Sequence, residues 1–371
     1  MRIGMVATPW YALPPTAYGG IESVCADLVD ALVARGHDIV LVGAGTNGTA
    51  AGRFVATYDA PQSDRIGAAL PEALHAARAG RALREAVLHG GLDIIHDHST
   101  AGPLLAGSRA VPTVITTHQP TVGEHGDYYN ALGPQVVCVA VSAAQRAAAP
   151  CLPWAGTVHN AVRVHSYPFR QRKGDYALFL GRSSPEKAPH LAIDAARAAG
   201  VPIVLAGKCT ERAEEAYFKA EIAPRLGADA RWVGEADAAA KRRLLAGARC
   251  LVFPIQWDEP FGMVMAEALA CGTPVVALER GSVPEVVRHG VTGYVCSEPE
   301  DLAEGIRRIE RISTHACRGD AVERFDVPVM AAAYERVYCQ ILRRAPQVDL
   351  RVDLRRPRGV VSPQFHPTAP G

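Results

Sequence analysis

Short apolar strands and amphipathic helices alternate along this chain, and that alternation limits the folds open to it. Residues 2–7 form a short apolar run, residues 20–35 carry apolar side chains at helical spacing, and residues 38–42 are again apolar. A strand, a helix and a strand in this order make a βαβ unit, whose crossover requires a parallel sheet. The pattern continues with a predicted helix over 70–88 and strands over 93–96, 111–117 and 136–141. The first half is therefore predicted to be doubly wound α/β.

A second α/β pattern follows the polar, proline-containing residues 166–175, which are typical of a linker. Its predicted strands cover 176–180, 202–206, 231–233, 250–253 and 274–277, and its predicted helices cover 187–199, 211–225, 238–246 and 302–311. A chain of 371 residues is also long enough for two domains. We predict Rossmann-like domains over 1–162 and 163–327, and a C-terminal helix within 328–345. Residues 346–371, rich in proline and arginine, are predicted to be a disordered tail.

Composition and charge narrow the partners that this chain can have. The formal net charge is +1, without the basic excess that nucleic-acid-binding proteins carry. No apolar run approaches the roughly eighteen residues that a membrane-spanning helix needs, and the first residues lack the apolar stretch of a signal peptide. Nine cysteines without a Cys-x-x-Cys pair favour reduced, packed thiols over a disulfide frame or a zinc site. We expect a cytoplasmic protein whose main partner is not nucleic acid.

The strongest functional signal lies between residues 253 and 293. A polar loop carrying Asp258 and Glu259 follows an apolar strand, and Gly262 precedes a predicted helix over 263–270. A helix that begins after glycine presents unpaired backbone N–H groups and a positive dipole end, which suit a phosphate. Glu259 and Glu267 would lie about 12 Å apart at helical rise, close to the length of a sugar nucleotide. Taken alone, however, the two glutamates also fit a solvated amphipathic helix.

The whole string of residues carries more information than the glutamates alone. Glu259-Pro-Phe-Gly, Glu267, Ala-Cys-Gly-Thr-Pro-Val-Val and Gly-Ser-Val-Pro-Glu285 together resemble the signature of retaining glycosyltransferases of family 4. The resemblance implies the GT-B fold, in which an acceptor domain and a donor domain, both doubly wound and Rossmann-like, face each other across a cleft. The last helix of such proteins commonly crosses back to the first domain.

The resemblance also implies roles for individual residues. Glu259 is expected to contact the donor sugar and Glu267 to hold the ribose. The backbone between them, which is expected to bind the diphosphate, includes Phe261, Gly262, Met263 and Val264. Arg182 and Lys187 match the Gly-Arg…Lys pattern of the family and could place two cations on one diphosphate, the alternative being ordinary surface charge.

Loops of the first domain supply further candidates. Gly19 and Gly20 precede the first helix, where backbone can approach a phosphate or sugar, although a tight turn would explain them equally well. His118 follows a predicted strand, and the resemblance places an imidazole of this loop near the donor sugar. His96 and His98 are weaker candidates for the acceptor side, as is Asp97, because their segment could simply end a strand.

Three further positions have counterparts in the family. The backbone around Val233, Gly234 and Glu235 is expected to accept the nucleotide base. Asn160 resembles an Asn-Gly-Val motif but is followed by alanine instead of glycine. Glu285 is predicted to have a structural role, as an acidic residue that interacts with the dipole of its own helix.

The resemblance implies a reaction: transfer of a hexose, with retention, from a UDP- or GDP-linked sugar to an acceptor hydroxyl. Many transferases hold a metal with Asp-x-Asp, which does not occur in this chain, so we predict a metal-independent enzyme without a cofactor, in which Arg182, Lys187 and the helix start stabilise the leaving group. A sugar-nucleotide epimerase of the same fold and a non-catalytic nucleotide-sugar binding protein are the alternatives. The acceptor could be a small molecule, a glycan or a lipid, and a lipid would bring the protein to a membrane surface, although no basic amphipathic helix supports this. The sequence leaves the oligomeric state undetermined.

Overall fold

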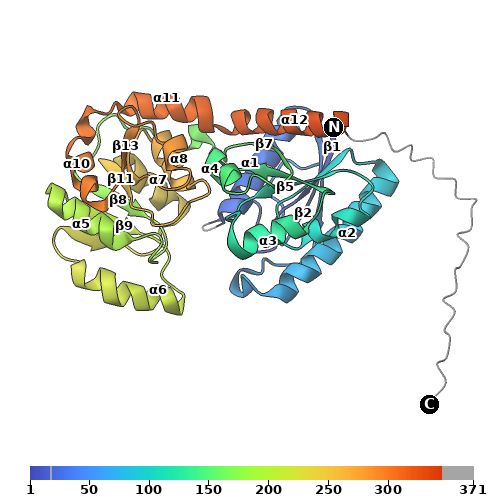
Figure 1. The fold of residues 1–371 in the computed structure, drawn as a ribbon, viewed down its shortest axis with the longest axis horizontal. Coiled ribbons are helices and arrows are strands. Elements are labelled where there is room, and N and C mark those ends of the chain that lie inside the picture. Colours follow the sequence, from blue (N-terminus) through green and yellow to red (C-terminus); the bar gives the residue numbers. More distant parts are fainter. Residues whose placement is uncertain (17–18, 345–371) are drawn as a thin grey trace, which may run out of the picture.

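The computed structural model describes residues 1–16 and 19–344, which form two α/β domains, each built on one sheet (Figure 1). The first sheet has seven strands in the order β3-β2-β1-β4-β5-β6-β7, and the second has six in the order β10-β9-β8-β11-β12-β13. All neighbouring strands in both sheets are parallel. The prediction of two doubly wound, Rossmann-like domains is confirmed.

Each sheet brings together short strands that are separated from one another in the sequence. The first sheet contains β1 (Arg2–Val6), β2 (Asp38–Gly43), β3 (Arg53–Ala56), β4 (Ile94–Asp97), β5 (Thr113–Thr117), β6 (Val136–Ala140) and β7 (Trp154–Thr157). The second contains β8 (Ala177–Leu180), β9 (Ile203–Ala206), β10 (Ala230–Trp232), β11 (Cys250–Phe253), β12 (Val275–Leu278) and β13 (Gly293–Cys296). All residues of β11 and β12 are buried and apolar, as expected for strands covered by helices on both faces.

Helices connect the strands and cover the sheets. The first domain has α1 (Gly20–Ala34), α2 (Ala69–Gly90), α3 (Gly123–Ala131) and α4 (Ala143–Ala148). The second domain has α5 (Pro189–Ala199), α6 (Arg212–Tyr217), α7 (Ala238–Gly247), α8 (Met263–Ala270), α9 (Val283–Val286), α10 (Leu302–Arg307) and α11 (Thr314–Phe325). Thr116, Leu180, Ala206 and Phe253, at the carboxyl ends of β5, β8, β9 and β11, border the same cavity, which is where open α/β sheets bind ligands.

The last helix, α12 (Val327–Arg344), follows α11 along one edge of the molecule and lies against the first domain (Figure 1). Its Tyr334 and Tyr338 are fully buried and belong to the same apolar cluster as Leu28 of α1. Glu335 pairs with Arg35 and also lies 3.1 Å from Nε2 of His37. The last described helix of the chain therefore packs on the first domain.

Local structure differs from the sequence predictions in several places. Strands β3, β7 and β13 and helices α3, α4 and α11 were not expected. The helix predicted over 211–225 is α-helical only in α6, and continues as a π-helical turn at Phe218–Ile222 and a 3-10 turn at Ala223–Arg225, where Pro224 cannot donate a backbone hydrogen bond. Lys187 precedes α5 instead of lying in its first turn. The predicted tail over 346–371 lies outside the described residues.

Candidate functional site

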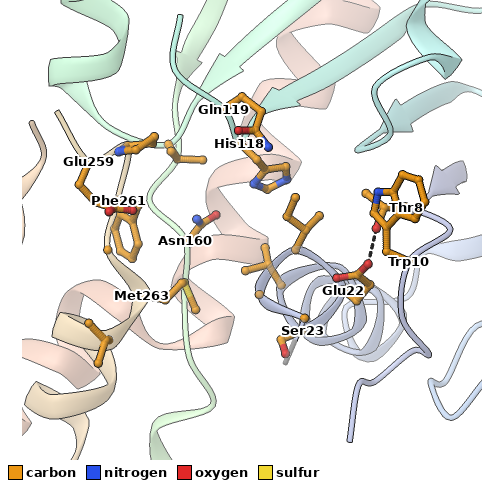
Figure 2. Close-up of a pocket in the computed structure, with 18 of the residues that line it drawn as sticks. Thr8, Trp10, Glu22, Ser23, His118, Gln119, Asn160, Glu259, Phe261 and Met263 are labelled. Atoms are coloured by element: carbon orange, nitrogen blue, oxygen red, sulfur yellow. Dashed lines mark hydrogen bonds between the residues drawn. The ribbon is translucent and has the colours of Figure 1, made fainter. Parts of the chain in front are cut away.

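A cavity of about 600 Å³ lies between the two domains and is lined by both (Figure 2). From the first domain come the loop after β1, the start of α1 and the loops after β4 and β5. From the second come the loops after β8, β9 and β11 and the first turns of α8. Most of the residues predicted from the sequence border this cavity: Gly19, Gly20, His118, Asn160, Arg182, Lys187, Glu259, Phe261, Gly262, Met263, Val264 and Glu267.

Glu259 is held in place through its side chain and its backbone. Its Oε2 forms an ion pair with Lys187 and also accepts a hydrogen bond from Nε1 of Trp257 at 3.1 Å. Its carbonyl oxygen accepts the N–H of Ser282 at 3.0 Å, which joins the loop to the segment after β12. The carboxylate is mostly buried but borders the cavity, so it can meet a bound hydroxyl without first being ordered.

The start of α8 requires glycine at position 262. Gly262 is the N-cap residue with φ of 71°, a left-handed conformation that favours glycine, and no side chain caps the helix there. A Cβ at this position would lie 2.7 Å from Cε of Met265 and 3.2 Å from the ring of Phe253. The first turn of α8 therefore borders the cavity with its backbone N–H groups uncapped by side chains, the arrangement expected at an anion site.

Glu267, one turn further along α8, is fixed by two neighbours and is only 7% exposed. Its Oε1 accepts a hydrogen bond from the Tyr167 hydroxyl at 2.9 Å and pairs with Nζ of Lys241 at 2.6 Å. Burial, together with the adjacent carboxylate, raises the pKa of Tyr167. The hydroxyl therefore stays protonated and donates to Glu267.

The two predicted cations of the second domain both have carboxylate partners. Nη2 of Arg182 lies 3.0 Å from Glu186, and Nη1 lies 3.8 Å from Glu214. Lys187 pairs with Glu259 and lies 5.2 Å from the centre of the Trp257 ring, within cation–π range. Both side chains border the same cavity as the start of α8, so this side of the site contains cations together with their carboxylate partners.

On the opposite side, His118 lies in the loop after β5, with its imidazole facing the cavity (Figure 2). Its Nε2 is 2.9 Å from Nδ1 of His98, and burial lowers the pKa of His118 to about 4. Burial likewise lowers the pKa of His98, whose Nε2 is buried without a partner. Both rings are therefore neutral near pH 7, and a single hydrogen bond between these two nitrogens joins them. His98 borders the cavity, as predicted for the acceptor side.

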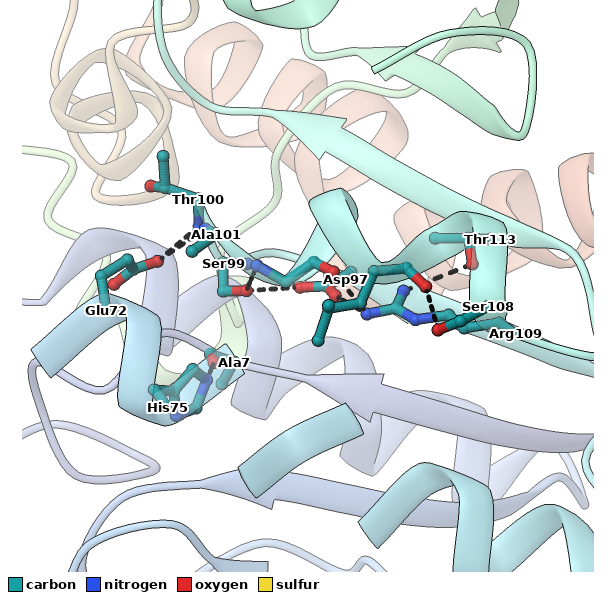
Figure 3. A network of polar contacts seen from close by, with 12 residues as sticks. Ala7, Glu72, His75, Asp97, Ser99, Thr100, Ala101, Ser108, Arg109 and Thr113 are labelled. Atoms are coloured by element: carbon teal, nitrogen blue, oxygen red, sulfur yellow. Dashed lines mark hydrogen bonds and ion pairs between the residues drawn. The ribbon is translucent and has the colours of Figure 1, made fainter. Parts of the chain in front are cut away.

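His96 and Asp97 do not line the cavity, contrary to the sequence prediction. His96 is fully buried, with its ring nitrogens 2.8 Å from Oγ1 of Thr116 and 2.7 Å from the hydroxyl of Tyr338 on α12. Asp97, the last residue of β4, pairs with Arg109 at 2.7 Å within a network of polar contacts (Figure 3). The contacts of both side chains therefore stabilise the fold, because α12 covers His96 and Arg109 neutralises Asp97.

The start of α1 borders the cavity through Gly19 and Gly20, as predicted. Glu22, in the first turn of α1, accepts a hydrogen bond from the Thr8 hydroxyl (Figure 2). Its side chain is 2% exposed, and burial raises its pKa in spite of the hydrogen bonds from Thr8 and the backbone. The positive end of the α1 dipole thus already faces a carboxylate.

Two predictions about backbone and helix ends differ in detail. Val233 and Gly234 lie just outside the cavity, and Val233 is 41% exposed, while Glu235 borders the cavity directly after them. Glu285 lies in the first turn of its own short helix α9, as predicted, but its hydrogen bonds also reach another helix. Its carboxylate accepts the N–H groups of Ala143 and Ala144, both at 2.7 Å, and so caps α4 of the other domain.

Several residues around the cavity were not identified from the sequence. Trp10, Glu22 and Tyr128 border it from the first domain, and Lys241 borders it from α7. Glu22 lies two residues after the Gly-Gly pair, so its position at a helix start was a usable signal. The others depend on long-range folding and carry no local pattern.

The described residues show neither a metal-ligand cluster nor a membrane span. Over residues 1–16 and 19–344, histidine, cysteine, aspartate and glutamate side chains nowhere gather in threes that could hold a metal ion. Within the same ranges, no helix has the length and apolarity needed to cross a bilayer.

Two Rossmann-like domains with a cavity between them are the arrangement of the GT-B fold. The model for glycosyl transferases group 1 matches residues 168–318, and that for glycosyltransferase family 4 matches residues 18–135. The chain belongs to this group 1 and family 4 class of glycosyltransferases, and it is an enzyme of the hexosyltransferase kind.

Curated relatives match over nearly the full chain. A glycogen synthase of Mycobacterium tuberculosis (strain H37Rv) is 28% identical, with 95% of this chain and 98% of the relative covered. A phosphatidyl-myo-inositol mannosyltransferase of the same organism is also 28% identical, with 91% and 96% covered. These two relatives are named for different products, so similarity alone does not fix the acceptor.

Solved structures share the fold. AviGT4, a glycosyltransferase involved in avilamycin A biosynthesis, is 26% identical, with a TM-score of 0.71 and 93% and 99% of the two chains covered. A sucrose-phosphate synthase from Thermosynechococcus elongatus has a TM-score of 0.75 at 17% identity, with 93% and 100% covered. Anabaena HepE, solved with UDP and glucose, has a TM-score of 0.70 at 20% identity, with 92% and 100% covered. The GT-B fold is therefore confirmed.

Proposed function

We propose that this enzyme transfers a hexose from a nucleoside-diphosphate sugar, UDP- or GDP-linked, to an acceptor hydroxyl, with retention of configuration and without a metal ion, in the cytoplasm. One observation carries the proposal: the uncapped start of α8 borders the cavity between Glu259 and Glu267, with Lys187 beside it. A diphosphate at the helix start would have a carboxylate at each end for hydroxyl groups of the sugar and the ribose.

The cations of the second domain suit the leaving group. When the bond between the anomeric carbon and the phosphate oxygen breaks, negative charge builds on that oxygen and must be stabilised where it develops. Lys187, Arg182 and the N–H groups of α8 border the same part of the cavity and can share this charge. This arrangement supports a reaction that does not depend on a divalent cation.

Retention is best explained by substitution on the front face of the sugar. The acceptor oxygen bonds to the anomeric carbon on the face from which the phosphate departs, and the departing phosphate oxygen takes the acceptor proton. Glu259 would position the sugar, and His118 would meet it from the other domain. A double displacement needs a carboxylate nucleophile next to the anomeric carbon, and we assign that role to neither Glu259 nor Glu267, because Glu259 positions a sugar hydroxyl and Tyr167 and Lys241 hold Glu267.

The names of similar proteins support a hexose and a uridine nucleotide. HepE was solved with UDP-glucose as well as with UDP, and one curated relative is a mannosyltransferase. The sequence alternatives of an epimerase and a non-catalytic binding protein are not favoured, because the relatives described above are synthases and transferases.

Donor hydrolysis tests the proposal. Purified enzyme is incubated with UDP-, GDP- and ADP-linked hexoses, with and without EDTA, and the released nucleotide is measured. We expect one or two donors to be hydrolysed slowly and equally with EDTA, and the transferred sugar to keep its anomeric configuration by proton NMR. Loss of turnover in EDTA would refute metal independence, and an isomerised sugar nucleotide formed from donor alone would favour the epimerase.

The role of Glu259 has its own test. Glu259→Gln keeps the shape of the side chain but removes the charge paired with Lys187, and we expect kcat to fall about a hundredfold, the loss typical for one stabilising group at a reacting centre. Glu279→Gln, at an exposed position of the same domain, is the matched control. Normal turnover of the Glu259 variant would contradict the assigned role.

A further inference from the structure

Positive charge in the cavity is confined to one domain. Among the described residues that border it, lysine and arginine come only from the second domain, and these are Arg182, Lys187, Lys208 and Lys241. The first domain contributes neither residue type to the described lining. The side of the cavity that remains for the acceptor, once the donor occupies the second domain, therefore offers no cation of its own.

The first domain instead supplies aromatic rings and neutral polar groups. Trp10 and Tyr128 border the cavity, and the Tyr128 hydroxyl donates to the carbonyl oxygen of Thr100, which fixes the ring. Figure 2 shows Trp10 beside Thr8, across the cavity from Glu259. Aromatic faces with a few placed hydrogen-bonding groups are typical of small-molecule sites, and here these groups are neutral apart from one acid.

The charged residue that the first domain does place there is an acid. Glu22 borders the cavity, is held by Thr8, and occupies the first turn of α1, where an anionic ligand would otherwise find the positive helix end. A phosphate or carboxylate bound on this side would lose its hydration without gaining a cation, and would face a carboxylate as well. Burying an unpaired charge in this way is costly.

The cations of the second domain do not remove this difficulty, because the donor diphosphate is expected to occupy their side of the cavity, where they also have carboxylate partners. Lys208 lies 2.8 Å from Glu211, and Arg182 lies 3.0 Å from Glu186. Lys187 and Lys241 pair with the two glutamates that flank the start of α8. All four lie on the side assigned to the donor diphosphate.

We propose that the acceptor is a neutral polyhydroxy compound, a sugar or cyclitol either free or as a glycoside, and that the cavity discriminates against acceptors carrying a phosphate or carboxylate. This inference rests on the proposed function and adds the acceptor class to it. Glu22 and the polar groups near it accept and donate hydrogen bonds to hydroxyls, while Trp10 and Tyr128 cover the apolar faces of the ring.

Matched pairs of acceptors test the inference. With the donor found by the hydrolysis screen, transfer is measured to glucose and glucose 6-phosphate, to myo-inositol and inositol 1-phosphate, and to methyl glucoside and methyl glucuronide. We expect the neutral member of each pair to have at least tenfold higher kcat/KM, or to suppress donor hydrolysis at a correspondingly lower concentration. In Glu22→Gln, we expect the ratio of anionic to neutral acceptor use to rise about tenfold, whereas Glu124→Gln, at an exposed position of α3, leaves the ratio unchanged.

Failures of the two proposals give different results. Hydrolysis of a donor with equal or better use of the phosphorylated acceptors overturns the acceptor inference and leaves the proposed function standing. Hydrolysis of a donor that no neutral acceptor in the panel suppresses or diverts also overturns the acceptor inference alone. Failure to hydrolyse or bind any nucleotide sugar overturns the proposed function and the inference built on it.

Discussion

Replacing Glu285 with glutamine should weaken the contact between the second domain and helix α4 of the first domain. The carboxylate of this donor-domain residue accepts two N–H groups at the start of α4, and Nε2 of His159 lies 3.1 Å from it. Glutamine has one acceptor oxygen, and an NH2 group stands where the carboxylate had its second oxygen. One of the two backbone N–H groups therefore loses its acceptor and faces a donor instead. Losing such a cap costs about 1–2 kcal/mol. The local opening equilibrium of α4 should therefore rise roughly 5- to 30-fold.

Amide hydrogen exchange measures this effect directly, because α4 can open without the whole protein unfolding. The peptide that contains residues 143–148 should exchange faster in Glu285→Gln by the factor above, while peptides from β11 and β12 should not change. Glu323→Gln, an exposed position on α11 of the same domain, is the control. Exchange of α4 within twofold of the unmodified enzyme would refute the reasoning.

The stabilisation that Glu285 provides to this contact should also depend on pH. Burial raises the pKa of Glu285, but the hydrogen bonds from His159 and from the N–H groups of Ala143 and Ala144 outweigh it, so the pKa is lowered from its ordinary value of 4.5. A lowered pKa in the folded state stabilises the protein above about pH 4.5, and this contribution is lost as the pH falls through the folded pKa. The difference in melting temperature between the enzyme and Glu285→Gln should therefore shrink on acidification below pH 4.5.

Three further changes test contacts around the cavity. Arg109→Met leaves Asp97 buried without its cation and should lower the free energy of unfolding by about 3–5 kcal/mol in urea titrations, whereas no loss would mean that the pair is not buried in solution. Tyr167→Phe removes one hydrogen bond to Glu267 and should weaken nucleotide binding in calorimetry by about three- to tenfold, with kcat little changed. His98→Ala removes the partner of the imidazole on the loop after β5 and should lower kcat about tenfold, with His98→Asn recovering most of it; equal kinetics of both variants would contradict a positioning role.

Periodicity was sufficient to predict the architecture of this chain. The inner parallel strands are buried on both faces, so each appears as a short apolar run, and each covering helix has one apolar face. Segments such as residues 20–35 and 263–270 carry that signal locally. The short edge strands β3 and β7 were not predicted, because none of their residues is fully buried and their sequences contain no continuous apolar run.

The donor side of the site was predictable because its residues are close together in the chain. Glu259, Gly262 and Glu267 belong to one loop and one helix, so their spacing fixes their relation. Contacts between distant segments could not be predicted in this way. Glu285 meets a helix start 142 residues away in the chain, and His96 is removed from the cavity by α12, which follows it by more than 200 residues.

The ion pairs on the donor side suggest how binding and catalysis are linked under the proposed function. Lys187 and Glu259 neutralise each other, so both are held near the start of α8 without leaving a buried charge unpaired. A diphosphate that binds there competes with Glu259 for Lys187. The carboxylate released by this exchange can accept a hydrogen bond from a sugar hydroxyl. Glu259 would therefore become available to the sugar only after the phosphates have engaged Lys187, which couples recognition of the two parts of the donor.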